Sequence, residues 1–180
     1  MKLKKMSDAD IGKYIRNIPD FPKKGIQFKD ITTLLKDAAV FKESVNWMAS
    51  LFKSEEIDKV VSLESRGFVF AAPLAVALDA GLVLIRKNGK LPAECLSVKY
   101  SLEYGEDIFE MHTDSLKEGE RVVIVDDLLA TGGTARAAVD LVEKAKASIK
   151  AICVLIELEE LGGREKIKDY PIYSRIKYPS

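Results

Sequence analysis

The sequence of 180 residues has few of the side chains on which metalloproteins and disulfide-rich proteins depend, with two cysteines and one histidine. Cys95 and Cys153 stand far apart and form no CxxC pair. This argues against a disulfide framework or a thiolate metal site and favours a reducing compartment. His112 has no cysteine or acidic partner at metal-ligand spacing, so we interpret it as structural.

Net charge and long apolar runs are also lacking. The 28 basic and 28 acidic residues balance to zero, which argues against a nucleic-acid or membrane surface covering the molecule. The N-terminal sequence MKLKKMSDAD is basic, but no apolar run follows it, so we expect neither a signal peptide nor a membrane span. We therefore expect a cytoplasmic protein that binds neither nucleic acid nor membrane.

Repeats, low-complexity tracts and long glycine- or proline-rich linkers are absent, and 47% of the residues are hydrophobic. A chain of this length buries about 70% of its unfolded surface around one core. We therefore predict a single domain over residues 1–180.

Four aliphatic runs are typical of buried strands, and two helical patterns separate some of them. The strands are predicted at 59–64, 81–87, 121–127 and 151–158, and the helices at 67–80 and 133–146. Strands joined by helices form parallel sheets with helices on both faces. The predicted fold is therefore a doubly wound α/β domain with a mainly parallel sheet flanked by helices.

Other segments give weaker patterns. A helix is predicted over residues 7–18, with an irregular arm after it, and a second helix over residues 38–54. Residues 96–112 alternate weakly around a glycine, which predicts a hairpin that leaves the sheet rather than joining the core. Residues 171–178 are predicted to form a closing edge strand.

Two adjacent aspartates, Asp126 and Asp127, stand where the strand RVVIVDD ends. In open parallel sheets, ligands bind at the carboxyl ends of strands. The turn ATGGT at residues 130–134 then offers backbone N–H groups, glycines that permit close approach and the start of a helix, which together suit a phosphate monoester. The turn lacks the lysine of the GxxxxGK[ST] loop and does not match GxGxxG.

A ribose 5-phosphate carries both a phosphate, which suits the turn, and hydroxyl groups, which suit the two carboxylates. The turn would hold the phosphate, while Asp126 and Asp127 would accept hydrogen bonds from the 2- and 3-hydroxyls and stabilise an anomeric cation. The alternative is a strand end whose aspartates merely cap the next helix.

The segment VVIVDDLLATGGTARAA at residues 122–138 resembles the signature of type I phosphoribosyltransferases, which bind 5-phosphoribosyl 1-pyrophosphate (PRPP). Further segments are similar in order and spacing to the adenine phosphoribosyltransferases, and the resemblance spans nearly the whole chain. These segments are residues 18–35, 63–75, 86–92, 100–112 and 163–167.

The resemblance implies transfer of the 5-phosphoribosyl group from PRPP to N9 of adenine, giving AMP and pyrophosphate in purine salvage. It implies Mg²⁺ as the cofactor, held mainly by PRPP or pyrophosphate with no assured protein ligand, and a homodimer. It also implies an N-terminal helix and base-binding hood over residues 1–35, a core over 36–180 and a flexible β-hairpin lid at about 87–110.

The resemblance also assigns roles to individual residues. The residues implied to hold the phosphate of PRPP or AMP are Ala130, Thr131, Gly132, Gly133 and Thr134. Those implied to hold pyrophosphate are Arg66, Arg86, Lys87 and Lys90, and the last three could act on pyrophosphate bound to the neighbouring subunit. The implied catalytic residues are Asp126 and Asp127 at the ribose, Glu103 as acid/base for the N9 proton, and Tyr104 closing the lid.

For adenine, the resemblance implies Phe28 stacking on the purine, the backbone of Gln27 accepting from the 6-amino group and the amide of Lys29 donating to N1. An oxopurine reverses both polarities, which would exclude hypoxanthine. Without the resemblance, Phe28 is interpreted as core packing and Arg66 as a surface arginine. The basic segment and the hairpin residues would then be ordinary solvated positions.

Two other functions remain open from the sequence. A phosphoribosyltransferase for xanthine, hypoxanthine or orotate would share the VDDLLATGGT core. A regulator that senses PRPP or purine would usually add a basic surface or a DNA-binding domain, for which this chain has neither the length nor the charge.

Overall fold

The computed structural model describes residues 6–102 and 105–179. The chain divides into two compact units, Met1–Trp47 and Met48–Ser180. The predicted single-domain organisation, with its boundary between residues 35 and 36, stays a prediction.

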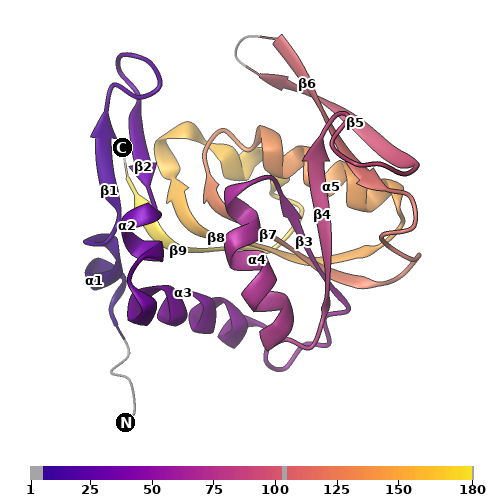
Figure 1. Cartoon of the computed structure of the whole chain (residues 1–180), viewed down its shortest axis with the longest axis horizontal. Helices are drawn as coiled ribbons and strands as arrows, with labels where there is room; N and C mark the ends of the chain where they lie inside the picture. Colours follow the sequence, from indigo (N-terminus) through magenta and orange to yellow (C-terminus); the bar gives the residue numbers. More distant parts are fainter. Residues whose placement is uncertain (1–5, 103–104, 180) are drawn as a thin grey trace. The chain divides into compact units, whose positions relative to one another are not determined.

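The N-terminal unit contains two short helices, a two-stranded antiparallel sheet and most of a longer helix (Figure 1). In chain order the elements are α1 (Asp8–Gly12), β1 (Arg16–Pro19), β2 (Gln27–Asp30), α2 (Thr32–Leu35) and α3 (Ala38–Leu51). Ser7 caps α1 by accepting a hydrogen bond from the backbone N–H of Asp10 at 3.2 Å, which satisfies one of the free donors of the first turn.

The helix predicted over residues 7–18 is shorter than expected, because it ends at Gly12 and Ile18 lies in β1. Glycine is a poor helix former, and the backbone beyond it pairs with β2, where Ile18 faces Phe28. The first pair of this sheet, Arg16 and Asp30, is also joined by a 2.5 Å hydrogen bond from Arg16 Nη2 to Asp30 Oδ2. Pairing between strands therefore replaces the second half of the predicted helix.

The larger unit is built on a seven-stranded sheet with the order β5-β6-β4-β3-β7-β8-β9 (Figure 1). Its strands are β3 (Lys59–Leu63), β4 (Gly81–Lys87), β5 (Cys95–Leu102), β6 (Gly105–His112), β7 (Arg121–Leu129), β8 (Ser148–Leu158) and β9 (Ile172–Tyr178). All pairs from β4 through to β9 are parallel, which confirms the predicted mainly parallel sheet and places β9 at the edge, as expected.

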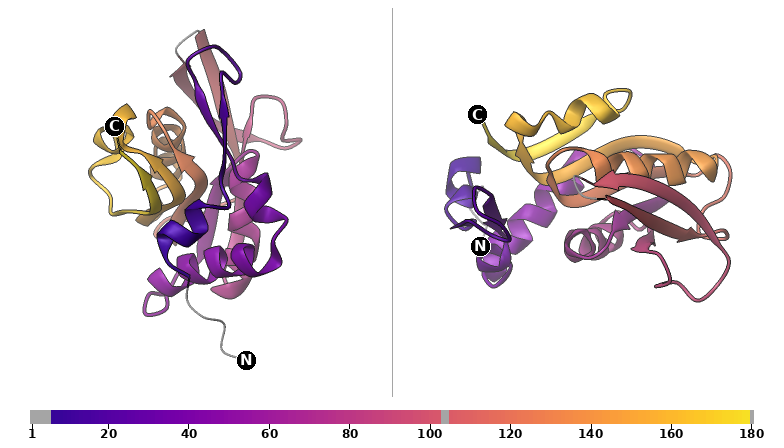
Figure 2. Two further views of the ribbon diagram at one scale, coloured as in Figure 1. Left: turned by 90° about the vertical axis from the view of Figure 1, so that its left-hand side faces the viewer. Right: turned by 90° about the horizontal axis from the view of Figure 1, so that it is seen from above.

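Two helices cover opposite faces of this sheet (Figure 2). They are α4 (Arg66–Ala77) and α5 (Gly133–Lys144), and the short 3₁₀ helices η1 (Glu159–Leu161) and η2 (Gly163–Ile167) follow β8. Because side chains alternate along a strand, Val61 and Ile124 pack with Val139 on the α5 face, whereas Ser62 lies beneath the start of α4. This two-faced arrangement confirms the predicted doubly wound fold.

The predicted hairpin forms, but the expectation that it leaves the sheet is wrong for its base. β6 pairs with β4 at Arg86↔Glu110 and Lys87↔Phe109, and the rings of Tyr100 and Phe109 stack with centroids 4.5 Å apart in the buried core. Burial of such rings is strongly favourable, which the weak alternation of the sequence does not reveal. The flexibility of the lid stays a prediction.

No helix in residues 6–102 and 105–179 is long and apolar enough to cross a membrane.

Candidate active site

The sheet changes winding direction beside β3. From β3 the chain proceeds to β4 on one side and later returns to β7 on the other, and open α/β sheets bind ligands at such switch points. The pairing of β3 with β7 ends at Ser62↔Val125, whereas β7 pairs with β8 as far as Leu129↔Glu157. β7 therefore continues, from Asp126 onward, beyond its last pair with β3.

Asp126 and Asp127 form a closely coupled acidic pair at this end. Asp127 is buried and Asp126 partly buried, and Asp126 Oδ1 accepts a 2.8 Å hydrogen bond from the backbone N–H of Asp127. Burial raises the pKa of Asp126 well above its ordinary value, and the charge of Asp127 raises it further. Burial also raises the pKa of Asp127, although Arg66 opposes this. Such shifts are frequent at ligand sites.

Within the described residues, the buried Asp127 Oδ2 atom accepts no hydrogen bond. Arg66 Nε lies only 2.9 Å from it, so we interpret the contact as an ion pair whose angle does not suit a hydrogen bond. This oxygen can still accept a hydrogen bond from a ligand hydroxyl or bind a cation.

Arg66 is positioned because it begins α4 directly after β3. The next residue, Gly67, packs closely: a Cβ atom there would lie 2.6 Å from Ser62 Oγ and 2.8 Å from Asp126 Oδ1. Only glycine therefore allows the first turn of α4 to approach the carboxylate pair this closely. Nothing in the sequence alone assigns a role to Gly67, although it lies in the motif ESRG.

The predicted phosphate turn, residues 130–134, runs from the end of β7 into the first residues of α5. Gly132 has a left-handed φ of +76° and caps α5, and a Cβ atom on it would lie 2.4 Å from the carbonyl oxygen of Gly163. Thr131 and Thr134 are exposed, and the first turn of α5, which is fully described, carries no acidic side chain. Exposed amides at a helix N-terminus attract anions.

The basic residues at the end of β4 have acidic partners. Arg86 Nε donates to Glu64 Oε2 at 2.8 Å, and Lys87 Nζ lies 2.9 Å from Asp107 Oδ2. The hydrogen bond from Lys87 lowers the pKa of Asp107. The backbone carbonyl of Lys90, beyond the strand, lies 3.4 Å from Arg86 Nη1. The structure thus brings these three residues together at the end of β4.

The residues predicted to bind adenine lie together on β2 in the N-terminal unit. The Phe28 ring packs edge-on against Phe21, with centroids 5.1 Å apart. The side chain of Asn17 contacts both neighbours of Phe28, donating to Gln27 Oε1 at 2.6 Å and accepting from Lys29 Nζ at 3.0 Å.

The predicted acid/base, Glu103, and its neighbour Tyr104 lie outside the described residues.

In the described part of the chain, no group of three or more His, Cys, Asp or Glu side chains could hold a metal ion. Asp126 and Asp127 nevertheless offer hard carboxylate oxygens, including the unsatisfied Oδ2 atom of Asp127, and such oxygens suit Mg²⁺. The pair therefore fits this ion only where a substrate supplies further ligands.

Comparisons with known proteins give one consistent family. The family model for the phosphoribosyl transferase domain matches residues 30–177. Adenine phosphoribosyltransferase of Roseiflexus sp. strain RS-1 is 52% identical over 170 residues, covering 94% of this chain and 99% of that protein. The Clostridium kluyveri enzyme of the same name is 53% identical over 164 residues, covering 91% and 95%.

Solved structures give the same result. Adenine phosphoribosyltransferase of Thermoanaerobacter pseudethanolicus superposes with a TM-score of 0.93 at 52% identity, covering 96% of this chain and 100% of that one. The Saccharomyces cerevisiae enzyme, solved with adenine and an imino-altritol bisphosphate, gives 0.89 at 37% identity, covering 94% and 98%. The chain therefore belongs to the phosphoribosyltransferase family, among the adenine phosphoribosyltransferases.

Proposed function

We propose that this protein transfers the 5-phosphoribosyl group of PRPP to N9 of adenine, giving AMP and pyrophosphate in purine salvage. The observation that carries the proposal is the glycine turn at residues 130–134, which follows the coupled carboxylates of Asp126 and Asp127 at the switch point of the sheet. The proposal places the protein in the cytoplasm, where its free thiols, Cys95 and Cys153, remain reduced.

The turn and the carboxylate pair hold the two ends of the sugar phosphate. Backbone N–H groups of residues 130–134 and the N-terminus of α5 bind the 5-phosphate. Asp126 and Asp127 accept hydrogen bonds from the ribose hydroxyls, and their charge stabilises the positive charge that develops at the anomeric carbon. Arg66, 2.9 Å from Asp127 Oδ2, favours the charged form of the pair and contacts the pyrophosphate.

The departing pyrophosphate needs positive charge beyond that of Arg66. Arg86, Lys87 and Lys90 supply it, with Glu64 and Asp107 holding the first two side chains in place. Mg²⁺, when bound, neutralises pyrophosphate charge, and Asp126 and Asp127 are the residues that would hold it together with substrate oxygens.

The base binds through groups that the family resemblance assigns. Phe28 stacks on the purine, the backbone carbonyl of Gln27 accepts from the 6-amino group, and the amide of Lys29 donates to N1. Adenine loses its N9 proton as it attacks the sugar, and Glu103, placed near N7, stabilises the resulting distribution of protons on the base. Tyr104 helps to exclude water from the sugar.

The role of Glu103 predicts that Glu103→Gln lowers kcat about 100-fold, because general acid/base groups contribute at least that much, while the KM values change little. Steady-state kinetics measure this. The control is Glu94→Gln, a carboxylate at the exposed start of the hairpin, which should leave kcat unchanged. A normal kcat for Glu103→Gln would remove this residue from the chemistry.

Base selectivity tests the proposed function itself. Adenine should exceed hypoxanthine, xanthine and orotate by about 1,000-fold or more in kcat/KM, because a mismatched base leaves buried partners unpaired. The four bases are assayed side by side for pyrophosphate release with PRPP. A preference for hypoxanthine would overturn the assignment, and binding of PRPP without turnover of any base would favour a regulator.

A homodimer is part of the proposal, supported by exposed apolar side chains on the α4 face of the sheet. Val76 is 83% exposed, and Val69, two turns earlier on α4, is 37% exposed. Leu82 and Leu84 alternate with buried residues of β4 and are 39% and 37% exposed. Exposed apolar side chains mark association surfaces where they form a contiguous patch.

Sedimentation velocity should give twice the chain mass of 20.0 kDa. Val76→Lys should shift the protein towards monomer, because a buried lysine at an interface lacks a partner. Leu161→Lys, at a residue 44% exposed elsewhere on the larger unit, is the control and should remain dimeric. A monomeric wild-type protein would refute this part of the proposal.

A further inference from the structure

An ion pair between a buried carboxylate and a partly exposed arginine lies beside the start of the phosphate turn. Glu157 on β8 pairs in register with Leu129, the last residue of β7 before the turn. The side chain of Glu157 is only 4% exposed. A buried carboxylate of this kind is stable only when it is fully paired.

Arg164 of η2 supplies most of that pairing. Its Nε and Nη2 atoms donate to the two carboxylate oxygens of Glu157 at 2.5 and 2.8 Å, which is the bidentate geometry that fixes a guanidinium in one orientation. Its Nη1 atom also donates to the carbonyl oxygen of Ile172 at 3.2 Å, and the Ser174 hydroxyl donates to Glu157. Arg164 therefore ties η2 to both β8 and β9.

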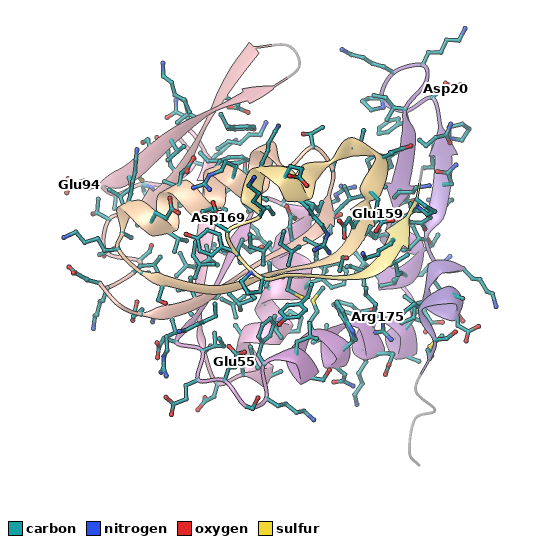
Figure 3. All side chains as sticks on the ribbon, turned by 180° about the vertical axis from the view of Figure 1, so that it is seen from behind. Asp20, Glu55, Glu94, Glu159, Asp169 and Arg175 are labelled. Atoms are coloured by element: carbon teal, nitrogen blue, oxygen red, sulfur yellow. The ribbon has the colours of Figure 1, made fainter. Side chains whose placement is uncertain are left out.

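The residue before Arg164 touches the phosphate turn. A Cβ atom on Gly163 would lie 2.2 Å from the carbonyl oxygen of Ala130 and 2.9 Å from the amide nitrogen of Gly132. The two backbone segments are thus in direct contact with no side chain between them. The segment that holds Gly163 and Arg164 lies between Glu159 and Asp169, both of which are labelled in Figure 3.

We propose that Arg164 is a positioning residue that sets the geometry of the phosphate turn through Gly163. Because close-packed backbones transmit displacement, releasing the guanidinium would let Gly163 move and widen the contact with residues 130–132. The amides of the turn would then lose their alignment towards a phosphate. The inference rests on the proposed function, since it takes residues 130–134 as the 5-phosphate site.

The test measures binding of ribose 5-phosphate by titration calorimetry, together with KM for PRPP and for adenine. Arg164→Met should weaken ribose 5-phosphate binding and raise KM for PRPP by about tenfold, a change of about 1.4 kcal/mol. KM for adenine should stay within about twofold. Arg164→Lys, which keeps one charged donor, should recover part of the loss.

Stability is separated from positioning by the double variant Glu157→Leu with Arg164→Met. Replacing a buried ion pair with apolar residues usually preserves stability, so this variant should melt close to the wild-type protein and still bind ribose 5-phosphate weakly. The matched control is Lys177→Met, which removes an exposed 2.9 Å ion pair between Lys177 on β9 and Glu159 on η1. It should behave as wild type.

The outcomes distinguish the two claims. Wild-type affinity for ribose 5-phosphate in Arg164→Met or in the double variant would overturn the positioning role, as would an equal rise in KM for PRPP and adenine. If the wild-type protein itself binds no ribose 5-phosphate, the proposed function fails instead.

Discussion

Replacing Gly132 with alanine is expected to lower kcat/KM for PRPP by at least about 100-fold. A left-handed backbone at a φ of +76° costs a non-glycine residue about 1–2 kcal/mol. The added methyl group would also lie 2.4 Å from the carbonyl oxygen of Gly163, which is backbone and cannot rotate away. The turn must therefore move, and a loss of about 2.7 kcal/mol in transition-state binding corresponds to this factor.

The control separates backbone strain from collision. Gly119 has a similar φ of +82°, but no atom lies within 4 Å of an added Cβ. Gly119→Ala should therefore lower the melting temperature without changing kcat/KM. Wild-type kinetics in a folded Gly132→Ala variant would mean that the turn does not contact the sugar phosphate.

Replacing Asp126 with asparagine is expected to lower kcat/KM by at least about 100-fold and to raise the melting temperature at pH 7. The carboxylate charge contributes to transition-state stabilisation, and the loss of one such group typically costs this factor. Asparagine retains an oxygen that accepts from the Asp127 amide, a bond of 2.8 Å. Activity and stability therefore change in opposite directions, as expected at a functional site.

The sign of the stability change follows from proton linkage. Burial raises the pKa of Asp126 in the folded state, so the folded protein binds this proton more tightly than the unfolded chain does. The wild-type protein gains stability from this group as pH falls through the raised pKa, and above that pKa the charge is destabilising. Asparagine removes the charge, so the difference between variant and wild type should shrink as pH falls.

Asp58 provides a control of opposite sign. Hydrogen bonds from Arg121 lower the pKa of Asp58, so its charge stabilises the fold until pH falls through that lowered pKa. Asp58→Asn should therefore lower the melting temperature at pH 7 and leave kcat/KM unchanged. Calorimetric melts from pH 5 to 9 compare the variants, and a lower melting temperature for Asp126→Asn at pH 7 would contradict the account.

Much of the larger unit could be predicted from the sequence because its signals are local. β4, β7 and β8 each contain a contiguous apolar run, and that of β3 is interrupted only by Ser62. Such runs are typical of strands in parallel sheets. The helix predicted to reach Ile18 was wrong because the competing interaction is pairing with Phe28, a partner outside any local window. The hairpin was misplaced because burial of Tyr100 and Phe109 depends on packing with the rest of the sheet.

In the candidate site, too, the residues with local signals were predictable and those that depend on distant packing were not. Asp126, Asp127 and the turn at residues 130–134 form one contiguous motif, so the sequence predicts them together. The contacts that position these residues are not contiguous in sequence. Gly67 packs on Ser62 and Asp126, and Gly163 packs on Gly132. Each contact joins distant parts of the chain, and a single glycine is the only local sign of it. Arg164 gave no signal beyond its place in the motif GREKI.

A crystal structure of the protein with bound AMP tests the central claim most directly. The account predicts the phosphate within hydrogen-bonding distance of backbone N–H groups of residues 130–134, with the ribose hydroxyls on Asp126 and Asp127. A phosphate bound elsewhere, with the ribose away from both aspartates, would contradict it.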